Sequence, residues 1–218
     1  MSSPLLSAKC IGRRIGTRWI WCNLDFDLYP SDRLAIVGPS GVGKSILVRA
    51  LAGLDPIQSG QLFYRGQPFS SLSMPHFRSQ VIYLHQQPSL IEGTVEENLK
   101  RVFSFASQRH KTYRRDWVLH ALSKFGRQAD FLELPIRKLS GGEAQMVSCL
   151  RVLQLEPRIL LLDEPTASLD EGNARTLEAL IRTWHEGDPD RAWIWIDHHP
   201  EGVRRMSNRQ FHLTERSQ

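Results

Sequence analysis

The sequence predicts an α/β fold in which antiparallel strands precede a parallel sheet and a helical segment interrupts the sheet. Three observations predict it. Alternating apolar and polar residues mark strands within residues 5–35, apolar residues recur at helical spacing over about 94–138, and the short apolar runs 159–162 and 193–196 are typical of buried parallel strands. With 218 residues, the chain has enough apolar content for one α/β domain or two small lobes.

The first elements follow in order along the amino-terminal part. The runs 19–22 and 24–28 predict antiparallel strands. The apolar run 34–37 predicts a further strand, and residues 46–51 predict a helix that ends at Leu54, Asp55 and Pro56. Residues 61–64 predict another strand, which closes at the turn signal Arg65-Gly66.

Directly after the strand at 34–37, the chain fits the phosphate-loop pattern G-x-x-x-x-G-K-[ST]. Its glycines let backbone N–H groups turn inward around phosphates, Lys44 supplies a point charge, and the Ser45 hydroxyl suits Mg²⁺. The positive end of the following helix faces the same group. The pattern predicts a nucleoside triphosphate site at Gly38, Pro39, Ser40, Gly41, Val42, Gly43, Lys44, Ser45 and Ile46.

The two buried strands of the second half each end in polar residues. Asp163 and Glu164 follow the run 159–162, at the strand end where open α/β sheets bind ligands. We expect Asp163 to hold the Mg²⁺ hydration shell and Glu164 to orient or deprotonate an attacking water. The second strand ends at Asp197-His198-His199, where a histidine suits a γ-phosphate, and a helix is expected over 173–185 between the two strands.

A second anion-binding element lies between the helical segment and the first acidic strand. Ser140, Gly141 and Gly142 open a helix whose first N–H groups and positive dipole end suit an anion. A single phosphate site does not need two such loops, so this element requires a second explanation.

At this point the chain resembles the ATP-binding-cassette (ABC) ATPases, specifically their free-standing nucleotide-binding subunits. The resemblance covers nearly the whole chain and includes, in order, the phosphate loop, Gln86, the signature 139–143, Asp163-Glu164, Asp170 and His198. It implies the P-loop NTPase fold of ABC ATPases, with a RecA-like core, an antiparallel β subdomain and a helical signature subdomain. One domain would span 1–218, with core and β subdomain at about 1–93 and 157–218 and the helical subdomain at about 94–156.

The resemblance also implies a head-to-tail homodimer that sandwiches two ATP molecules. Ser140 and Gly142 of one subunit would face the γ-phosphate held by Lys44 of the other, with Asp170 linking the two sites. Gln86 would contact Mg²⁺ and the attacking water, while His198 clamps the γ-phosphate and Glu164 polarises the water. The implied catalytic residues are Glu164, His198 and Gln86; the metal-binding residues are Ser45, Gln86 and Asp163; and Ser140, Gly141, Gly142 and Asp170 join the phosphate loop in binding ATP.

Three positions depart from the family pattern. The aromatic residue that stacks on adenine falls at Ile15 by register, with Trp19 as the nearest aromatic alternative. Ile46 stands where the family often has Thr, and Met146 where an Arg is common, although Arg151 is available for helix capping or contacts between lobes. None of these changes removes a hydrolytic group.

Charge and composition limit the partners. The net charge is +5, and the basic run 109–115 leaves open a solvated helical face, a nucleic-acid surface or a surface near anionic lipid. No apolar run approaches the ~20 residues of a membrane span, and residues 1–6 lack signal-peptide character, so any permease would be a separate chain. The family resemblance suggests that 92–98 receives a short helix of that permease.

Cysteines and histidines give no metal pattern. Cys10, Cys22 and Cys149 are odd in number and lack metal-ligand spacing, which predicts reduced packing residues. His198 and His199 would point to opposite faces if they lay in a strand, which argues against a metal site.

These observations favour the ATP-binding subunit of an ABC transporter, peripheral at the cytoplasmic face of the inner membrane. The stretch from 139 through 150–157 to 170–173 is most similar to small bacterial subunits of metal, particularly iron, export. Importer, exporter and non-transporting membrane regulator stay open. A different class, an ATP switch that serves a nucleic acid or an assembly scaffold, is favoured by the basic charge alone.

Overall fold

The computed structural model describes residues 3–214, which form two compact units. Unit 1 comprises 3–83, 158–163 and 189–214, and unit 2 comprises 84–157 and 164–188. The residues Met1 and Ser2 of the predicted non-signal amino terminus lie outside the described part.

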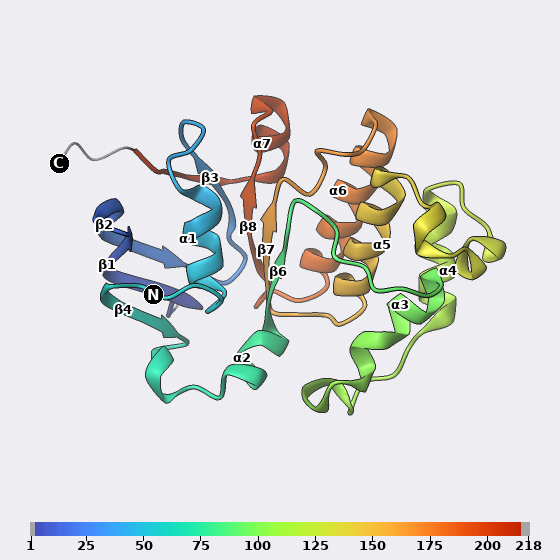
Figure 1. The fold of residues 1–218 in the computed structure, drawn as a ribbon, viewed down its shortest axis with the longest axis horizontal. Helices are drawn as coiled ribbons and strands as arrows, with labels where there is room; N and C mark the ends of the chain where they lie inside the picture. Colours follow the sequence, from blue (N-terminus) through green and yellow to red (C-terminus); the bar gives the residue numbers. More distant parts are fainter. Residues whose placement is uncertain (1–2, 215–218) are drawn as a thin grey trace. The chain divides into compact units, whose positions relative to one another are not determined.

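Unit 1 contains an antiparallel sheet with the strand order β2-β1-β4-β5 (Figure 1). Strands β1 (Leu6–Ile15) and β2 (Arg18–Leu28) pair with Leu6 opposite Leu28, and β1 also pairs with β4 (Ser59–Tyr64). The short β5 (Gln67–Pro68) forms the other edge. The predicted antiparallel strands are therefore confirmed.

The irregular pairing of β1 corrects one expectation about the cysteines. The β1–β2 register shifts between Ala8 and Ile11, where Cys10 has a positive φ of 50° and its N–H donates to Asp25 at 2.9 Å. A residue in such a bulge no longer follows the alternation of buried and exposed side chains along the strand. Cys10 is consequently exposed rather than packed, whereas Cys149 is buried as expected.

The second sheet of the fold has the order β6-β7-β8-β3-β9. Its strands are β3 (Arg33–Val37), β6 (Val81–Leu84), β7 (Ile159–Asp163), β8 (Ala192–Ile196) and β9 (Arg209–His212). The pairs β7–β8, β8–β3 and β3–β9 are parallel, so the predicted parallel sheet is confirmed. Every residue of β7 and β8 is buried, which explains their continuous apolar runs.

The helices of unit 1 are short. They are α1 (Lys44–Leu51), η1 (Phe69–Ser71), α2 (Met74–Gln80) and α7 (Pro200–Met206). Helix α1 ends three residues before the predicted stop because Gly53 takes a positive φ of 65° and the Leu54 N–H bonds back to the Arg49 carbonyl. The Arg49 guanidinium then makes two 2.9 Å hydrogen bonds to Asp55, which fixes the chain beyond the helix.

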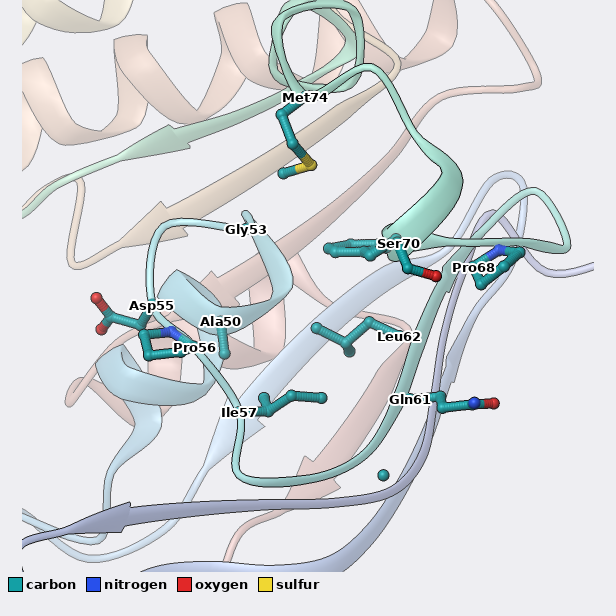
Figure 2. A pocket seen from close by; sticks show the side chains of 12 residues that line it. Ala50, Gly53, Asp55, Pro56, Ile57, Gln61, Leu62, Pro68, Ser70 and Met74 are labelled. Carbon is teal, nitrogen blue, oxygen red and sulfur yellow. The ribbon is translucent and has the colours of Figure 1, made fainter.

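A hollow of about 400 Å³ lies in unit 1 beside this turn. Figure 2 shows Ile57, Leu62 and Met74 around it, with Asp55 at its margin. Its lining is mainly apolar and contains none of the predicted nucleotide-binding residues.

Unit 2 is helical apart from its loops. Its elements are α3 (Val95–Arg101), η2 (Val102–Ser104), η3 (Ala106–Gln108), α4 (Arg115–Lys124), η4 (Ala129–Glu133), η5 (Ile136–Lys138), α5 (Gly141–Leu153) and α6 (Glu171–Glu186). The helical periodicity over 94–138 is thus realised as short helices separated by turns, and the helix expected over 173–185 begins two residues earlier, at Glu171. Among the described residues, no helix has both the length and the apolar character needed to cross a bilayer.

Asn98 ties the loop before α3 to that helix. Its side chain is fully buried, its Oδ1 accepts the Ile91 N–H at 2.9 Å, and its Nδ2 donates to the Ile91 carbonyl at 2.8 Å and the Thr94 carbonyl at 3.0 Å. Thr94 itself caps α3 through a reciprocal pair of bonds with Glu97.

We predict that Asn98→Leu lowers the free energy of unfolding by about 2 kcal/mol, because it leaves the part-buried backbone groups of Ile91 and the Thr94 carbonyl without this partner. The exposed Arg101→Ala on the same helix is the control and should change it by less than about 0.5 kcal/mol. Urea titration of both variants measures this difference. Equal midpoints would show that Asn98 does not hold the loop.

Candidate functional site

The predicted phosphate loop connects β3 to α1 in unit 1. The backbone at Gly41 and Gly43 has positive φ values of 78° and 97°, which side chains rarely adopt. A side chain at Gly43 would also collide with Ile20 and Trp21. The loop therefore requires glycine at this position both for its backbone conformation and for close packing.

Lys44 is buried inside this loop. Its ammonium donates to the carbonyl oxygens of Gly38 at 2.9 Å and Pro39 at 3.0 Å, so the side chain curls back over the loop rather than extending into solvent. Val42 is buried as well, whereas Pro39, Ser40 and Gly41 are exposed. The remaining predicted member, Ile46, lies in the first turn of α1 and packs against the core of unit 1.

Asp163, the last residue of β7, is held by two hydroxyl groups. The Ser45 hydroxyl donates to Oδ1 at 3.1 Å, and the Tyr83 hydroxyl donates to Oδ2 at 2.9 Å. Asp163 is 3% exposed, so these bonds satisfy a carboxylate that water scarcely reaches. Burial, followed by the negative charge of Asp163, raises the pKa of Tyr83 well above its ordinary value, which keeps the phenol protonated as a donor.

No pattern in the sequence indicates the role of Tyr83. The residue lies on β6, three positions before Gln86, and an aromatic residue is common in a β-strand. The contact between the Tyr83 hydroxyl and the buried Asp163 carboxylate becomes evident only once β6 is placed beside β7.

Glu164 and Gln86 come together in unit 2. The Gln86 side-chain amide donates to Glu164 Oε2 at 2.8 Å. Glu164 also has a positive φ of 48°, a conformation that strains a residue other than glycine and that occurs preferentially at functional sites.

His198 lies just beyond β8, outside the strand. The premise that His198 and His199 are adjacent strand residues is therefore wrong: Asp197 accepts the His199 N–H at 2.8 Å and starts the turn into α7. Both histidines are exposed. Among residues 3–214, no group of three or more His, Cys, Asp or Glu side chains is arranged to hold a metal.

The predicted signature forms the beginning of α5 in unit 2. Ser140 is the N-cap: its hydroxyl accepts the Glu143 N–H at 3.2 Å, while Glu143 Oε2 accepts the Ser140 N–H at 2.8 Å. A side chain at Gly142 would meet the Ser168 carbonyl, so glycine is needed for the close approach of the loop before α6. The proton of the Ser140 hydroxyl is left to donate elsewhere.

Asp170 is likewise a helix cap, at the start of α6. Its Oδ1 accepts the Asn173 N–H at 2.9 Å. This backbone bond and the bond from the Asn173 side-chain amide lower the pKa of Asp170. Ser140, Gly141, Gly142 and Asp170 line one hollow of about 350 Å³ within unit 2.

The two candidates for base stacking are both accessible. Ile15 is 54% exposed at the end of β1 and Trp19 is 40% exposed at the start of β2. The Arg14 guanidinium lies 5.7 Å from the centre of the Trp19 ring, so one ring face already has a cationic neighbour.

The basic run 109–115 is used largely for contacts inside unit 2. Lys111 donates to the Leu155 carbonyl just after α5, Arg114 pairs with Glu156 at 3.0 Å, and Arg115 pairs with Glu96 at 3.2 Å. Arg151, which the sequence leaves available for helix capping or contacts between lobes, donates to the Ser89 carbonyl at 2.7 Å.

Comparison with known proteins gives consistent findings. The family profile described as "ABC transporter" matches residues 22–167. The chain is 35% identical over 202 residues to the probable iron export ATP-binding protein FetA of Escherichia coli (strain K12), covering 93% of this chain and 88% of that protein. It is 30% identical to the hypophosphite import ATP-binding protein HtxD of Stutzerimonas stutzeri, covering 81% of this chain and 55% of that protein.

The fold is also similar to a solved structure. The dimeric ATP-binding cassette MJ0796, in a post-hydrolysis state bound to ADP and Pi, superposes with a TM-score of 0.81 at 23% identity and covers 95% of this chain and 94% of that one. At this identity the likeness establishes the fold.

We predict that Tyr83→Phe lowers the free energy of unfolding by about 1 kcal/mol at neutral pH, because Asp163 loses a donor. Tyr64→Phe, whose ring is also buried in unit 1, is the control at neutral pH only, because burial raises the pKa of Tyr64 as well. The raised pKa of Tyr83 makes this contribution complete below about pH 10 and diminishing as the pH rises above it. The difference between wild type and Tyr83→Phe should therefore shrink in alkaline urea titrations. A difference that grows with pH would contradict this account.

Proposed function

The chain belongs to the ABC transporter family, and on that premise we propose that it hydrolyses ATP at a head-to-tail dimer interface to drive a separate membrane permease. The observation that carries the proposal is the presence of two anion-binding elements in one chain. The phosphate loop lies in unit 1 and the Ser140 cap of α5 in unit 2. Two copies arranged head to tail would give each phosphate loop a signature from the other copy.

In this proposal the phosphate loop grips the β- and γ-phosphates. Inward-facing N–H groups of the loop and the Lys44 ammonium neutralise their charge, and Lys44 exchanges the carbonyls of Gly38 and Pro39 for phosphate oxygens. The partner's Ser140 hydroxyl and the first N–H groups of its α5 complete the site, with Asp170 linking the two sites. His198 clamps the γ-phosphate.

The oxygens at Ser45 and Asp163 fit Mg²⁺, which prefers hard oxygen ligands. They already lie 3.1 Å apart, and Gln86 offers a further amide oxygen. When bound, the ion would neutralise charge on the β- and γ-phosphates. Tyr83 fixes Asp163 through its other oxygen, so the carboxylate keeps one orientation while the ion is exchanged.

Glu164 is the proposed general base. Its carboxylate takes a proton from the attacking water as the bond between the γ-phosphorus and the bridging oxygen breaks. The Gln86 amide, 2.8 Å from Oε2, orients this carboxylate. The strained backbone at Glu164 holds the side chain in a direction that a relaxed strand end would not give.

We place the permease contact at residues 92–98 and the protein at the cytoplasmic face of the membrane. Asn98 supports this placement, because it stiffens the loop that would receive the permease helix. Similarity to the FetA protein supports metal export, particularly of iron, as the transport direction and cargo. The internal pairing of Lys111, Arg114 and Arg115 argues against the basic run 109–115 as a nucleic-acid surface.

We predict that Glu164→Gln preserves ATP binding but lowers turnover by about 10² to 10⁴-fold, because the base is lost while the phosphate contacts remain. Dimers should then accumulate with ATP and Mg²⁺ in size-exclusion chromatography. The exposed Glu133→Gln is the control and should behave as wild type. Monomeric elution together with normal turnover would refute the assignment.

We also predict that Lys44→Ala weakens nucleotide binding, whereas Ser140→Arg blocks hydrolysis by crowding the partner's γ-phosphate. A mixture of these inactive variants can form a dimer in which one site carries neither change. Activity should therefore reappear on mixing, as measured by phosphate release. If mixed dimers form and no activity returns, the composite site is wrong.

A further inference from the structure

We propose that Arg127 contacts the phosphates of the nucleotide held by a second copy of this chain, and that Glu143 retains Arg127 until that nucleotide arrives. The inference rests on the proposed head-to-tail site and adds to it a residue from outside the signature. Its starting point is the hollow of about 350 Å³ in unit 2.

Arg127 lines the same hollow as the signature. Helix α4 ends in a turn at Gly126, which has a positive φ of 69°, and this turn brings Arg127 beside Ser140 and Gly142. The side chain is 44% exposed, so its guanidinium is accessible from solvent.

The charged side chains that line this hollow indicate that Arg127 binds phosphate. Two carboxylates line it, those of Glu143 and Asp170, and Arg127 is the one cationic side chain among the described residues that do so. A hollow that receives ATP phosphates must offset those two negative charges. A guanidinium suits this role because it binds phosphate oxygens through two parallel N–H groups.

Two contacts keep Arg127 in place. Its Nη2 lies 2.8 Å from Glu143 Oε1, and its guanidinium carbon lies 5.6 Å from the centre of the Phe131 ring. The other Glu143 oxygen accepts the Ser140 N–H at 2.8 Å. One carboxylate thus joins Arg127 to the N-cap of α5.

Glu143 is suited to this role in its ionised form. Its partial burial alone would raise its pKa, but the hydrogen bonds from Ser140 and the charge of Arg127 lower it. Triphosphate carries more negative charge than this single carboxylate, so it can draw the guanidinium away from Glu143 when the dimer closes.

The first test uses the ATP-dependent dimer of Glu164→Gln. Adding Arg127→Ala should raise the ATP concentration needed for half-dimerisation by about tenfold or more. ATP affinity of the isolated subunit, measured at concentrations below dimerisation, should stay within about twofold, because Arg127 acts on the other copy's nucleotide. Arg137→Ala, an exposed arginine of the same unit outside the hollow, is the matched control.

The variant Glu143→Gln distinguishes two roles of Arg127, a contact with phosphate and a purely structural ion pair. The amide oxygen can still accept the Ser140 N–H, but it no longer holds Arg127 by charge. The proposal predicts that this variant dimerises at lower ATP concentration than its Glu164→Gln parent. If Glu143→Gln and Arg127→Ala weaken dimerisation alike, the pair is structural and the proposal fails.

The second test asks which subunit Arg127 serves. Arg127→Glu should be inactive alone, because it places a carboxylate against the partner's phosphates, and mixing it with Lys44→Ala should restore ATPase activity, because one site of the mixed dimer then has both Lys44 and the partner's Arg127. If activity returns in the mixture of Ser140→Arg with Lys44→Ala but not in the mixture of Arg127→Glu with Lys44→Ala, the proposed role of Arg127 is wrong and the composite site stands. If neither mixture recovers and Glu164→Gln never dimerises, the composite site itself falls, and this inference with it.

Discussion

Parallel pairing of β3, β8 and β7 sets the chemistry of unit 1, because it brings the carboxyl ends of these strands to one edge of the sheet. The phosphate loop leaves β3 at that edge, Asp163 ends β7 there, and Asp197 follows β8. The hydrogen bonds from Ser45 and Tyr83 to Asp163 depend on this alignment, since their three chain segments are far apart in sequence. A shift of one residue in the pairing would turn Asp163 to the other face of the sheet.

Much of this arrangement could be predicted from the sequence, because strand burial and phosphate loops leave local patterns. The buried runs of β7 and β8, the antiparallel β1 and β2, and the glycines around Lys44 all follow from residue types at short spacing. Interactions between distant segments leave no such pattern. Tyr83, Asn98 and Arg127 each resemble an ordinary strand or surface residue until their partners Asp163, Ile91 and Glu143 are in place. The bulge that exposes Cys10 and the turn that takes His198 out of its strand arise from similar contacts, in which Asp25 and Asp197 bind backbone N–H groups.

In unit 2, the residues that cap helices also line the proposed binding site. Ser140 and Asp170 each satisfy the first turn of a helix, and both line the hollow that would meet a nucleotide. Capping fixes these side chains before any ligand binds, which reduces the entropy lost on binding. Glu143 contacts both the Ser140 cap and Arg127. One carboxylate therefore links the start of α5 to the only cationic side chain that lines the hollow among the described residues.

The central claim is that a phosphate loop and a signature from two different copies form one site. Cysteine cross-linking between copies tests it most directly, with one copy carrying Ser40→Cys and the other Ser168→Cys, both with Cys10 and Cys22 replaced by serine. The account predicts a disulfide between the two different variants when ATP is present, because the phosphate loop of one copy would then lie within disulfide reach of the hollow of the other. Cross-linking that ignores ATP, or that joins Ser40→Cys copies to each other instead, would contradict the head-to-tail site.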